Sequence, residues 1–395
     1  MIQPFSIAHL PRIEFGAGGI TKLPSLIARY GNRVLLVTGQ RSFTDSPYWP
    51  ALLAALDKVG IGWEQARVGD EPSPQLVDET VRQFHGKGVT VIVGIGGGSV
   101  LDAAKAIAGL LPNGDSVMNY LEGVGPEKPY EGPATPFIAV PTTAGTGSEA
   151  TKNAVLSLRG PNGFKKSFRD DKLVPEYALL DPDLLASCPK PQIAANAMDA
   201  LTQLLESYVS SKANPFTDAL AESGLKAVRE GLFAWYAGGD EAAAGRSRMA
   251  YAALLSGVCL AQTGLGSVHG LASPLGAFFP IPHGVVCGTL IGAATRVSLA
   301  ALRERDSANL AWRKYARASD LLHGRHYPSI EESHAALLAR LDDWTERLAL
   351  PRLSAYGIQE HAFAHIVAHS RGSSMKTNPL TLSDAEIAEV LRQRL

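Results

Sequence analysis

The stretch VTVIVGIGGGSVLDAAK, residues Val89–Lys105, carries the strongest structural signal in this sequence. A short β-branched run leads into glycines, and these lead into an Ala- and Leu-rich segment. This order is typical of a strand, turn and helix in a parallel α/β sheet. Glycines without Cβ let the backbone approach a phosphate, and a helix N-terminus favours an anion. Taken alone, the motif is equally consistent with an ordinary tight turn.

The segments before and after this unit show the same alternation. Arg33–Thr38 and Pro136–Val140 are further short apolar runs, whereas Trp49–Val59 and Gln75–His85 have helical spacing. Apolar runs that alternate with helical segments indicate a parallel sheet with helices on its faces.

A second polar loop, PTTAGTGSE, follows the apolar run that ends at Val140. It places four hydroxyls and two glycines within nine residues, Pro141–Glu149. In an α/β sheet both loops should lie beyond the carboxyl ends of strands, where ligands bind. Together they predict a cradle for phosphate and ribose.

The second half of the chain has a different texture. Ala- and Leu-rich segments at helical period dominate, for example Ala194–Ser211 and Gly245–Thr263. The Pro-containing stretch Ser187–Pro191 is the natural joint. We therefore expect an α/β dinucleotide-binding domain over residues 1–185 and an all-α domain over 186–395.

Composition and charge exclude several classes of protein. The chain has 395 residues, 46% of them hydrophobic, and a formal net charge of -1. This is a globular composition, with no bulk charge that favours nucleic acid or an anionic membrane. The three cysteines, Cys188, Cys259 and Cys287, are odd in number and far apart, which indicates a reducing compartment. No basic segment followed by an apolar run opens the chain, and the apolar stretch Tyr251–Leu260 is too short to span a bilayer. We expect a cytoplasmic protein.

Three residues of the second half share the chemistry of a metal site: Asp199, His269 and His283. Each histidine precedes a glycine in apolar surroundings, where an unpaired imidazole is costly. Two imidazoles and a carboxylate suit Fe²⁺ or a catalytic Zn²⁺, and Gln203 shares a helix face with Asp199. Two satisfied core histidines and a helix-face aspartate are the alternative. The i, i+4, i+8 set His361, His365 and His369 lacks such glycine turns, and we expect it to be solvated or partly packed.

Several long motifs occur in an order that resembles one known family, the iron-containing (group III) alcohol dehydrogenases. These motifs are Gly96–Lys105, Pro141–Thr151, Asp181-Pro182, Met198–Ser210, Val268–Gly276, Pro282–Gly284 and Asn378-Pro379. The resemblance runs from end to end. It implies the dehydroquinate synthase-like fold, with an N-terminal dinucleotide-binding domain, a helical metal domain and the cofactor in the cleft between them.

The resemblance also assigns roles to individual residues. Gly96, Gly97, Gly98 and Ser99 would hold the pyrophosphate, with Asp102 supporting that loop or the nicotinamide end. Ribose and nicotinamide would lie along Thr142, Thr143, Thr146 and Ser148. Lys165 matches a lysine near the cofactor and the reaction centre, and Asp199, His269 and His283 match metal ligands.

Two positions depart from the family pattern. Gln203 and Ser273 stand where the family usually has histidines. A glutamine oxygen can coordinate, but it is a harder donor than imidazole, so retention of Fe²⁺ or Zn²⁺ is in question. The loss of imidazole at Ser273 removes a candidate proton relay.

The loop after the first strand bears on the choice of cofactor. An acidic residue there would bind the adenosine ribose and repel a 2′-phosphate. Instead the sequence has Gly39-Gln40-Arg41-Ser42, and Gly39, Arg41 and Ser42 suit the extra phosphate. The loop favours NADP(H) over NAD(H).

We therefore predict an NAD(P)-dependent alcohol dehydrogenase or aldehyde reductase, acting on a small alcohol or aldehyde with a divalent metal. The resemblance implies a homodimer or higher homo-oligomer. The alternatives are a metal-free maleylacetate-reductase-like enzyme, a dehydroquinate-synthase-like lyase and a non-catalytic dinucleotide-binding protein. The lyase needs basic residues for a substrate phosphate, and Lys165, Lys166 and Arg169 are the candidates.

Overall fold

The computed structural model describes residues 4–160 and 163–395. Met1–Gln3, with which the first expected domain begins, and Pro161 and Asn162 lie outside the described residues. The chain divides into two compact units, one formed by Ala8–Leu158 and Lys165–Cys188 and the other mainly by Pro189–Leu395. Each is described by itself below.

The first unit is built on a six-stranded parallel sheet with the strand order β1-β8-β5-β4-β2-β3. Its strands are β1 (Arg12–Phe15), β2 (Arg33–Gly39), β3 (Gly62–Val68), β4 (Val91–Gly96), β5 (Phe137–Pro141) and β8 (Tyr177–Leu180). A separate two-stranded sheet contains β6 (Asn153–Leu158) and β7 (Phe164–Arg169). Every residue of β4 and β5 is buried, as expected for central strands of a parallel sheet.

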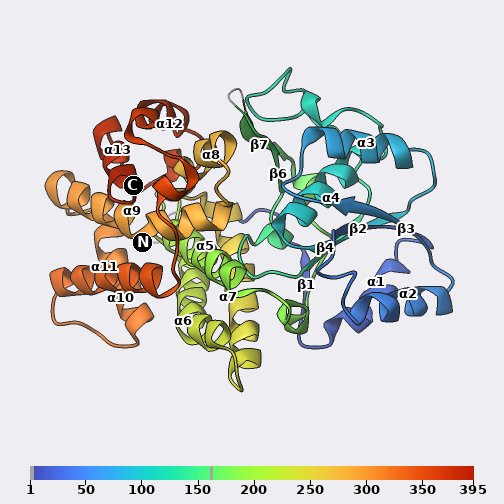
Figure 1. Ribbon diagram of the computed structural model, residues 1–395, viewed down its shortest axis with the longest axis horizontal. Coiled ribbons are helices and arrows are strands. Elements are labelled where there is room, and N and C mark those ends of the chain that lie inside the picture. Colours follow the sequence, from blue (N-terminus) through green and yellow to red (C-terminus); the bar gives the residue numbers. More distant parts are fainter. Residues whose placement is uncertain (1–3, 161–162) are drawn as a thin grey trace. The chain divides into compact units, whose positions relative to one another are not determined.

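Four helices of this unit cover the two faces of the sheet. They are α1 (Leu23–Ile27), α2 (Tyr48–Lys58), α3 (Pro74–Phe84) and α4 (Gly98–Leu110). α1 packs beside α2 and α3 beside α4, on opposite faces (Figure 1). Right-handed crossovers require this arrangement, because the chain moves outward from β2 to β3 and then returns past β2 to β4.

The reversal at β2 is a topological switch point. β3 lies on one side of β2 and β4 on the other, so the loops after β2 and β4 leave the sheet side by side. Ligands of open α/β sheets bind at such points. The glycine turn between β4 and α4 therefore lies where a dinucleotide is expected.

The second unit is helical. Its helices are α5 (Lys190–Val209), α6 (Pro215–Ala237), α7 (Ala242–Thr263), α8 (Ser267–Phe278), α9 (His283–Arg305), α10 (Leu310–His323), α11 (Ile330–Arg347), α12 (Phe363–His369) and α13 (Asp384–Arg392). α5 is buried from Ile193 to Val209 and packs against α6, α7 and α9 (Figure 1). The parallel sheet with flanking helices and the helical second half confirm the predicted fold class.

Helices α5 and α9 approach each other closely because α9 carries glycines at the contact. A Cβ added at Gly284 would lie 2.6 Å from the carbonyl oxygen of Ala195, and one added at Gly288 would lie 2.8 Å from Cβ of Met198. Side chains at these two positions would force the helices apart.

α9 adds to the sequence analysis, which considered only Tyr251–Leu260 as an apolar stretch that could span a bilayer. α9 is long and apolar enough to span a bilayer, with a mean hydropathy of 1.7, but 89% of that window is buried inside the protein. Its apolar side chains belong to the core of the helical unit, where they pack with α8, α12 and α13.

Candidate functional site

The glycine turn opens α4 without a side-chain cap. Gly97 is the N-cap residue and has no side chain to cap the first turn, and Gly97, Gly98 and Ser99 are partly exposed. An uncapped, accessible N-terminus of a thirteen-residue helix presents its dipole and N–H groups to an anion. This geometry is the one expected for a pyrophosphate site.

The two predicted cofactor loops touch. The Thr142 N–H donates to the carbonyl of Gly96 at 2.9 Å, since β4 and β5 are neighbours. A Cβ added at Gly98 would lie 2.7 Å from Cγ2 of Thr146, and one added at Gly97 would lie 3.3 Å from Thr143. A side chain at Gly98 would displace Thr146, and one at Gly97 would press on Thr143, so glycine at these positions favours the close approach of the two loops.

A fully buried lysine fixes the base of the second loop. Lys105 Nζ donates to Ser148 O, Ser148 Oγ, Thr151 Oγ1 and Asn153 O, at 2.7–3.1 Å. Burial lowers the pKa of Lys105 to about 8. The sequence analysis quoted Lys105 only as part of a motif. The signal was present, because a lone lysine among Ala103, Ala104 and Ala106 has no place in an apolar helix unless it is paired.

Three other predicted residues gather near Lys105. Ser148 Oγ donates to Asp102 Oδ1 at 2.5 Å, and burial raises the pKa of Asp102. The positive charge of Lys165 acts to lower the pKa of Asp102, but Lys165 forms its ion pair with Glu71, at 2.9 Å. Asp102, Ser148 and Lys165 thus belong to one polar group beside the glycine turn.

The loop after β2 lies beside the glycine turn, as the switch point requires. A Cβ added at Gly39 would lie 3.8 Å from both Ser42 Oγ and Val100 Cγ2, the latter in α4. Arg41 is exposed, and its Nε donates to Asp45 Oδ2 at 2.9 Å. The structure therefore brings Gly39 and Ser42 close to the start of α4 and leaves Arg41 at the surface.

In the helical unit, the structure brings Asp199 and the two predicted histidines together. Asp199 Oδ1 lies 3.3 Å from His269 Nε2 and 3.7 Å from His283 Nε2. The other oxygen, Oδ2, is buried without a hydrogen-bond partner. The side chain of Asp199 is 1% exposed and that of His283 28%, so the cluster is accessible from the His283 side. Each residue comes from a different helix: α5, α8 and α9.

A second carboxylate orients His269. Glu206 Oε2 lies 2.7 Å from His269 Nδ1, and Glu206 also accepts from the N–H groups of Gly266 and Val268. An imidazole that donates from Nδ1 presents the Nε2 lone pair to an ion. Glu206 was missed in the sequence, although it lies seven residues after Asp199 and so on the same face of α5.

The charges of the cluster favour a cation. Burial opposes the charged form of His269, but Cys287 and the carboxylates of Asp199 and Glu206 outweigh it and raise the pKa of this imidazole. Burial likewise opposes the carboxylate of Asp199, but His283 and His269 keep its pKa below the usual range. Both shifts indicate that positive charge is stabilised between Asp199 and the imidazoles.

Gln203 and Ser273 are close to the cluster. Gln203 Nε2 lies 3.4 Å from Asp199 Oδ1, while Gln203 Oε1 accepts from Ser256 at 2.7 Å. Ser273 lies one turn after His269 on α8 and is partly exposed.

A thiol completes a group of four. Asp199, His269, His283 and Cys287 each offer one ligand atom, and these atoms lie within 4.8 Å of one another. Burial raises the pKa of Cys287 to about 12. The sequence analysis did not single out Cys287, although it lies four residues after His283 and so on the same helix face.

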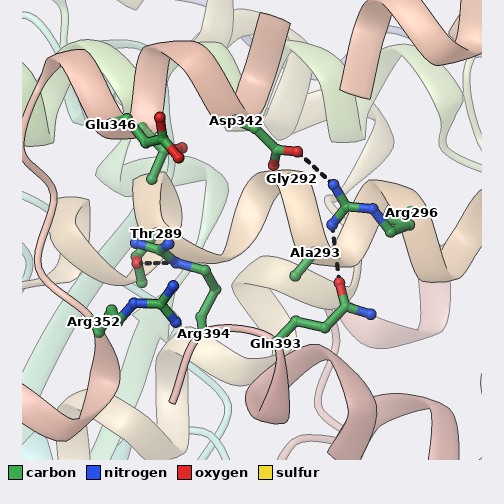
Figure 2. Close-up of a pocket in the computed structure, with 10 residues that line it drawn as sticks. Thr289, Gly292, Ala293, Arg296, Asp342, Glu346, Arg352, Gln393 and Arg394 are labelled. Atoms are coloured by element: carbon green, nitrogen blue, oxygen red, sulfur yellow. Dashed lines mark hydrogen bonds and ion pairs between the residues drawn. The ribbon is translucent and has the colours of Figure 1, made fainter. Parts of the chain in front are cut away.

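Several polar side chains that line a pocket of the helical unit pair with one another. A pocket of about 220 Å³ lies along the later turns of α9 (Figure 2). There Arg296 pairs with Asp342 and donates to Gln393, and Arg394 donates to Thr289. These bonds tie the C-terminal residues to α9, and no predicted ligand lines the pocket.

The three histidines near the C-terminus are separate from the cluster. His361, His365 and His369 are exposed, and the rings of His365 and His369 stack with Phe278, with centroids at 4.6 and 5.3 Å. The structure places these two side chains in an aromatic contact at the surface of the helical unit.

Comparison with known proteins identifies the family. The model of iron-containing alcohol dehydrogenases matches residues 11–182, and that of the C-terminal domain of the same family matches residues 193–395. The chain is 31% identical to alcohol dehydrogenase 4 of Saccharomyces cerevisiae over 327 residues, 82% of this chain and 81% of that protein. It is 30% identical to 1-propanol dehydrogenase PduQ of Salmonella typhimurium over 395 residues, 97% and 98% of the two chains.

Solved structures agree with this assignment. A crystal structure of 1,3-propanediol oxidoreductase matches with a TM-score of 0.89 at 27% identity, over 100% of both chains. Sulfoacetaldehyde reductase from Bifidobacterium kashiwanohense, solved with NAD⁺, matches with a TM-score of 0.83 at 25% identity, over 99% of both chains. The chain belongs to the iron-containing alcohol dehydrogenase family, and is an oxidoreductase of the metal-associated, NAD(P)-dependent alcohol dehydrogenase type.

Proposed function

We propose that Asp199, His269 and His283 hold a divalent metal, Fe²⁺ or Zn²⁺, for hydride transfer between a nicotinamide dinucleotide and a small alcohol or its aldehyde. One observation carries the proposal: buried Asp199 lies between two imidazoles, with its second oxygen unpartnered. A buried carboxylate in that position is costly without a cation. When bound, the ion would act as a Lewis acid toward the substrate oxygen.

The residues of the α/β unit bind and orient the dinucleotide in this proposal. Gly96–Ser99 receives the pyrophosphate, and Thr142, Thr143, Thr146 and Ser148 line ribose and nicotinamide. Asp102 and Lys165 form the polar group beside them. The support is steric, since Gly97 and Gly98 leave no room for side chains between the loops. The dinucleotide itself supplies the hydride chemistry.

NADP(H) is the proposed cofactor, ahead of NAD(H). The loop Gly39–Ser42 carries no carboxylate to repel a 2′-phosphate. The ion pair of Arg41 with Asp45 is exposed, at 85% and 55% of the side chains, so it contributes little and is readily exchanged for a phosphate. We expect Arg41→Ala to lower kcat/KM for NADP⁺ more than for NAD⁺. An equal effect on both cofactors would contradict the assignment.

The metal-free, maleylacetate-reductase-like alternative rests on Gln203 and Ser273, which replace two histidines. The lyase alternative loses support, because Lys165 pairs with Glu71 and Arg169 with Glu122, at 2.9 and 3.1 Å. We further propose a cytoplasmic location, from the three free cysteines, and a homodimer or higher homo-oligomer, from the family. Light scattering tests the latter.

Elemental analysis and initial rates test the main proposal. The purified chain should hold one metal ion and reduce NADP⁺ or NAD⁺ with small alcohols such as 1-propanol or 1,3-propanediol. Chelation should abolish the rate, and Fe²⁺ or Zn²⁺ should restore it. Full activity in metal-free protein would establish the metal-free alternative. No turnover of any alcohol or aldehyde would leave only dinucleotide binding.

A further inference from the structure

Cys287 is buried beside Asp199, His269 and His283, but it is not among the metal ligands proposed above. It lies on α9 one turn after His283, so both side chains leave the helix on the same face. Its Sγ lies 3.5 Å from His269 Nε2 and 3.8 Å from His283 Nε2. The thiol therefore faces the two imidazoles that the metal site requires.

Four of the six distances between these ligand atoms match the edges of a tetrahedral site, and all six are at most 4.8 Å. Zn²⁺ lies ~2.0–2.1 Å from nitrogen or oxygen and ~2.3 Å from sulfur, so a tetrahedral site has edges of ~3.3 Å between N or O atoms and ~3.6 Å to sulfur. Asp199 Oδ1 lies 3.3 and 3.7 Å from the two imidazole nitrogens. The corresponding distances of 3.5 and 3.8 Å for Cys287 Sγ match the longer edge.

Gln203, the other candidate for the fourth ligand, is oriented differently. Its Oε1, the atom able to ligate, lies 2.7 Å from Ser256 Oγ, whose single proton is shared with the carbonyl of Ala253 at 2.8 Å. The amide group that faces Asp199 Oδ1, at 3.4 Å, is Nε2, which donates hydrogen bonds and does not bind metals. In this orientation Gln203 supports the carboxylate ligand from outside.

We propose that Cys287, rather than Gln203, is the fourth protein ligand, and that the resulting Asp–His–His–Cys set favours Zn²⁺ over Fe²⁺. The inference rests on the proposed metal site. A thiolate is a soft ligand that suits Zn²⁺, and Zn²⁺ binds such sites more tightly than Fe²⁺ in any case. Binding would require loss of the Sγ proton to solvent, and the His283 side chain, which is 28% exposed, would leave that side of the site accessible to a substrate oxygen.

Cobalt substitution tests the donor set without relying on activity. The full chain is stripped with a chelator and titrated with Co²⁺. A bound thiolate gives a near-ultraviolet charge-transfer band that oxygen and nitrogen ligands do not give. Wild type should show this band at one Co²⁺ per chain, and Cys287→Ser should bind Co²⁺ without it. Gln203→Ala should keep the band, as should Cys259→Ser, which removes another buried thiol.

Competition with a chromophoric chelator then measures selectivity. Cys287→Ser should lose more Zn²⁺ affinity than the ~10–100-fold typical of losing an outer-shell partner. Its affinity for Fe²⁺, measured anaerobically, should fall less, so the Zn²⁺/Fe²⁺ ratio should drop.

The outcomes separate the two proposals. Stoichiometric Co²⁺ binding by wild type without the band, or loss of the band in Gln203→Ala alone, would overturn the role of Cys287 and leave the metal site intact. Failure of wild type to bind Co²⁺ or Zn²⁺ would overturn the metal site itself. If Cys287→Ser does not fold, the wild-type spectrum still decides whether a thiolate is bound.

Discussion

The proposed cofactor loops of the α/β unit and the proposed metal-ligand cluster of the helical unit are built in opposite ways. Each loop is one continuous segment of the chain, and its shape is set by its backbone and its glycines. The cluster draws single side chains from α5, α8 and α9, over residues 199 to 287. Added side chains would therefore disturb the loops, because glycines shape them. The cluster would instead be disturbed by loss of one of its few polar atoms, which are held at fixed spacing. The two should fail differently when mutated.

The largest effect is expected at the centre of the cluster. Asp199→Asn removes the charge that holds the proposed ion, and loss of several kcal/mol of Lewis-acid stabilisation corresponds to at least ~10³-fold in kcat/KM. Elemental analysis should show a metal-depleted chain, while dinucleotide binding, followed by NADPH fluorescence, stays near wild type. A metal-replete, active variant would contradict the assignment of Asp199.

The loops should respond most to loss of their buried cation. Lys105→Met leaves several oxygens of the second loop, and the nearby Asp102, without their partner, which should cost about 3–5 kcal/mol of the free energy of unfolding. Chemical denaturation followed by circular dichroism measures this loss. Lys58→Met, at an exposed position of α2, is the control and should change little. Equal stability of the two variants would refute a structural role for Lys105.

Because of the buried side chain of Glu149, in the second loop, we expect the free energy of unfolding to depend on pH. Burial raises the pKa of Glu149 from 4.5 to about 7. The folded state thus binds the proton more tightly, so stability is full below pH 4.5 and falls as the pH rises to about 7, by about 3 kcal/mol in all. Glu149→Gln should lack this fall, and the exposed control Glu79→Gln should retain it. Parallel denaturation curves at several pH values would show the difference.

A smaller effect is expected outside the ligand shell. Glu206→Gln should weaken metal affinity by ~10–100-fold, because Gln no longer holds His269 as a carboxylate does. Glu222→Gln, on α6, is the matched control. Chelator competition measures the change. An unchanged affinity would mean that helix packing alone positions His269.

The smallest effect is expected where one methyl group is added to the loops. A Cβ at Gly98 displaces Thr146, and Gly98→Ala should weaken dinucleotide binding by ~10-fold, equivalent to about 1.4 kcal/mol. Metal content should not change. Gly62→Ala, whose Cβ would meet only ordinary contacts, serves as the control in the same unit. Equal affinities would show that the loops adapt.

Local signals made the central strands and both loops predictable. Buried apolar runs before glycine-rich turns specify β4 and β5 without reference to distant residues. β1 and β8 were not found, because each has four residues and its place depends on pairing across 165 positions. Dependence on residues distant in sequence also explains which residues of the site could be predicted. Asp199, His269 and His283 were recognisable by residue type and motif, but Cys287 and Glu206 take on meaning only when the helices bring them to His269.

The glycines of α9 have a consequence for the ion that the proposed site of this chain would accept. Gly284 and Gly288 directly follow His283 and Cys287 on α9, and without side chains they let α9 pack against Ala195 and Met198 of α5, the helix that carries Asp199. The distance between α5 and α9 thus sets the spacing of the proposed metal ligands. A methyl group on either glycine would move α9 away from α5 and increase the distances between the proposed ligand atoms without changing any ligand. The site would then favour larger cations, which form longer bonds.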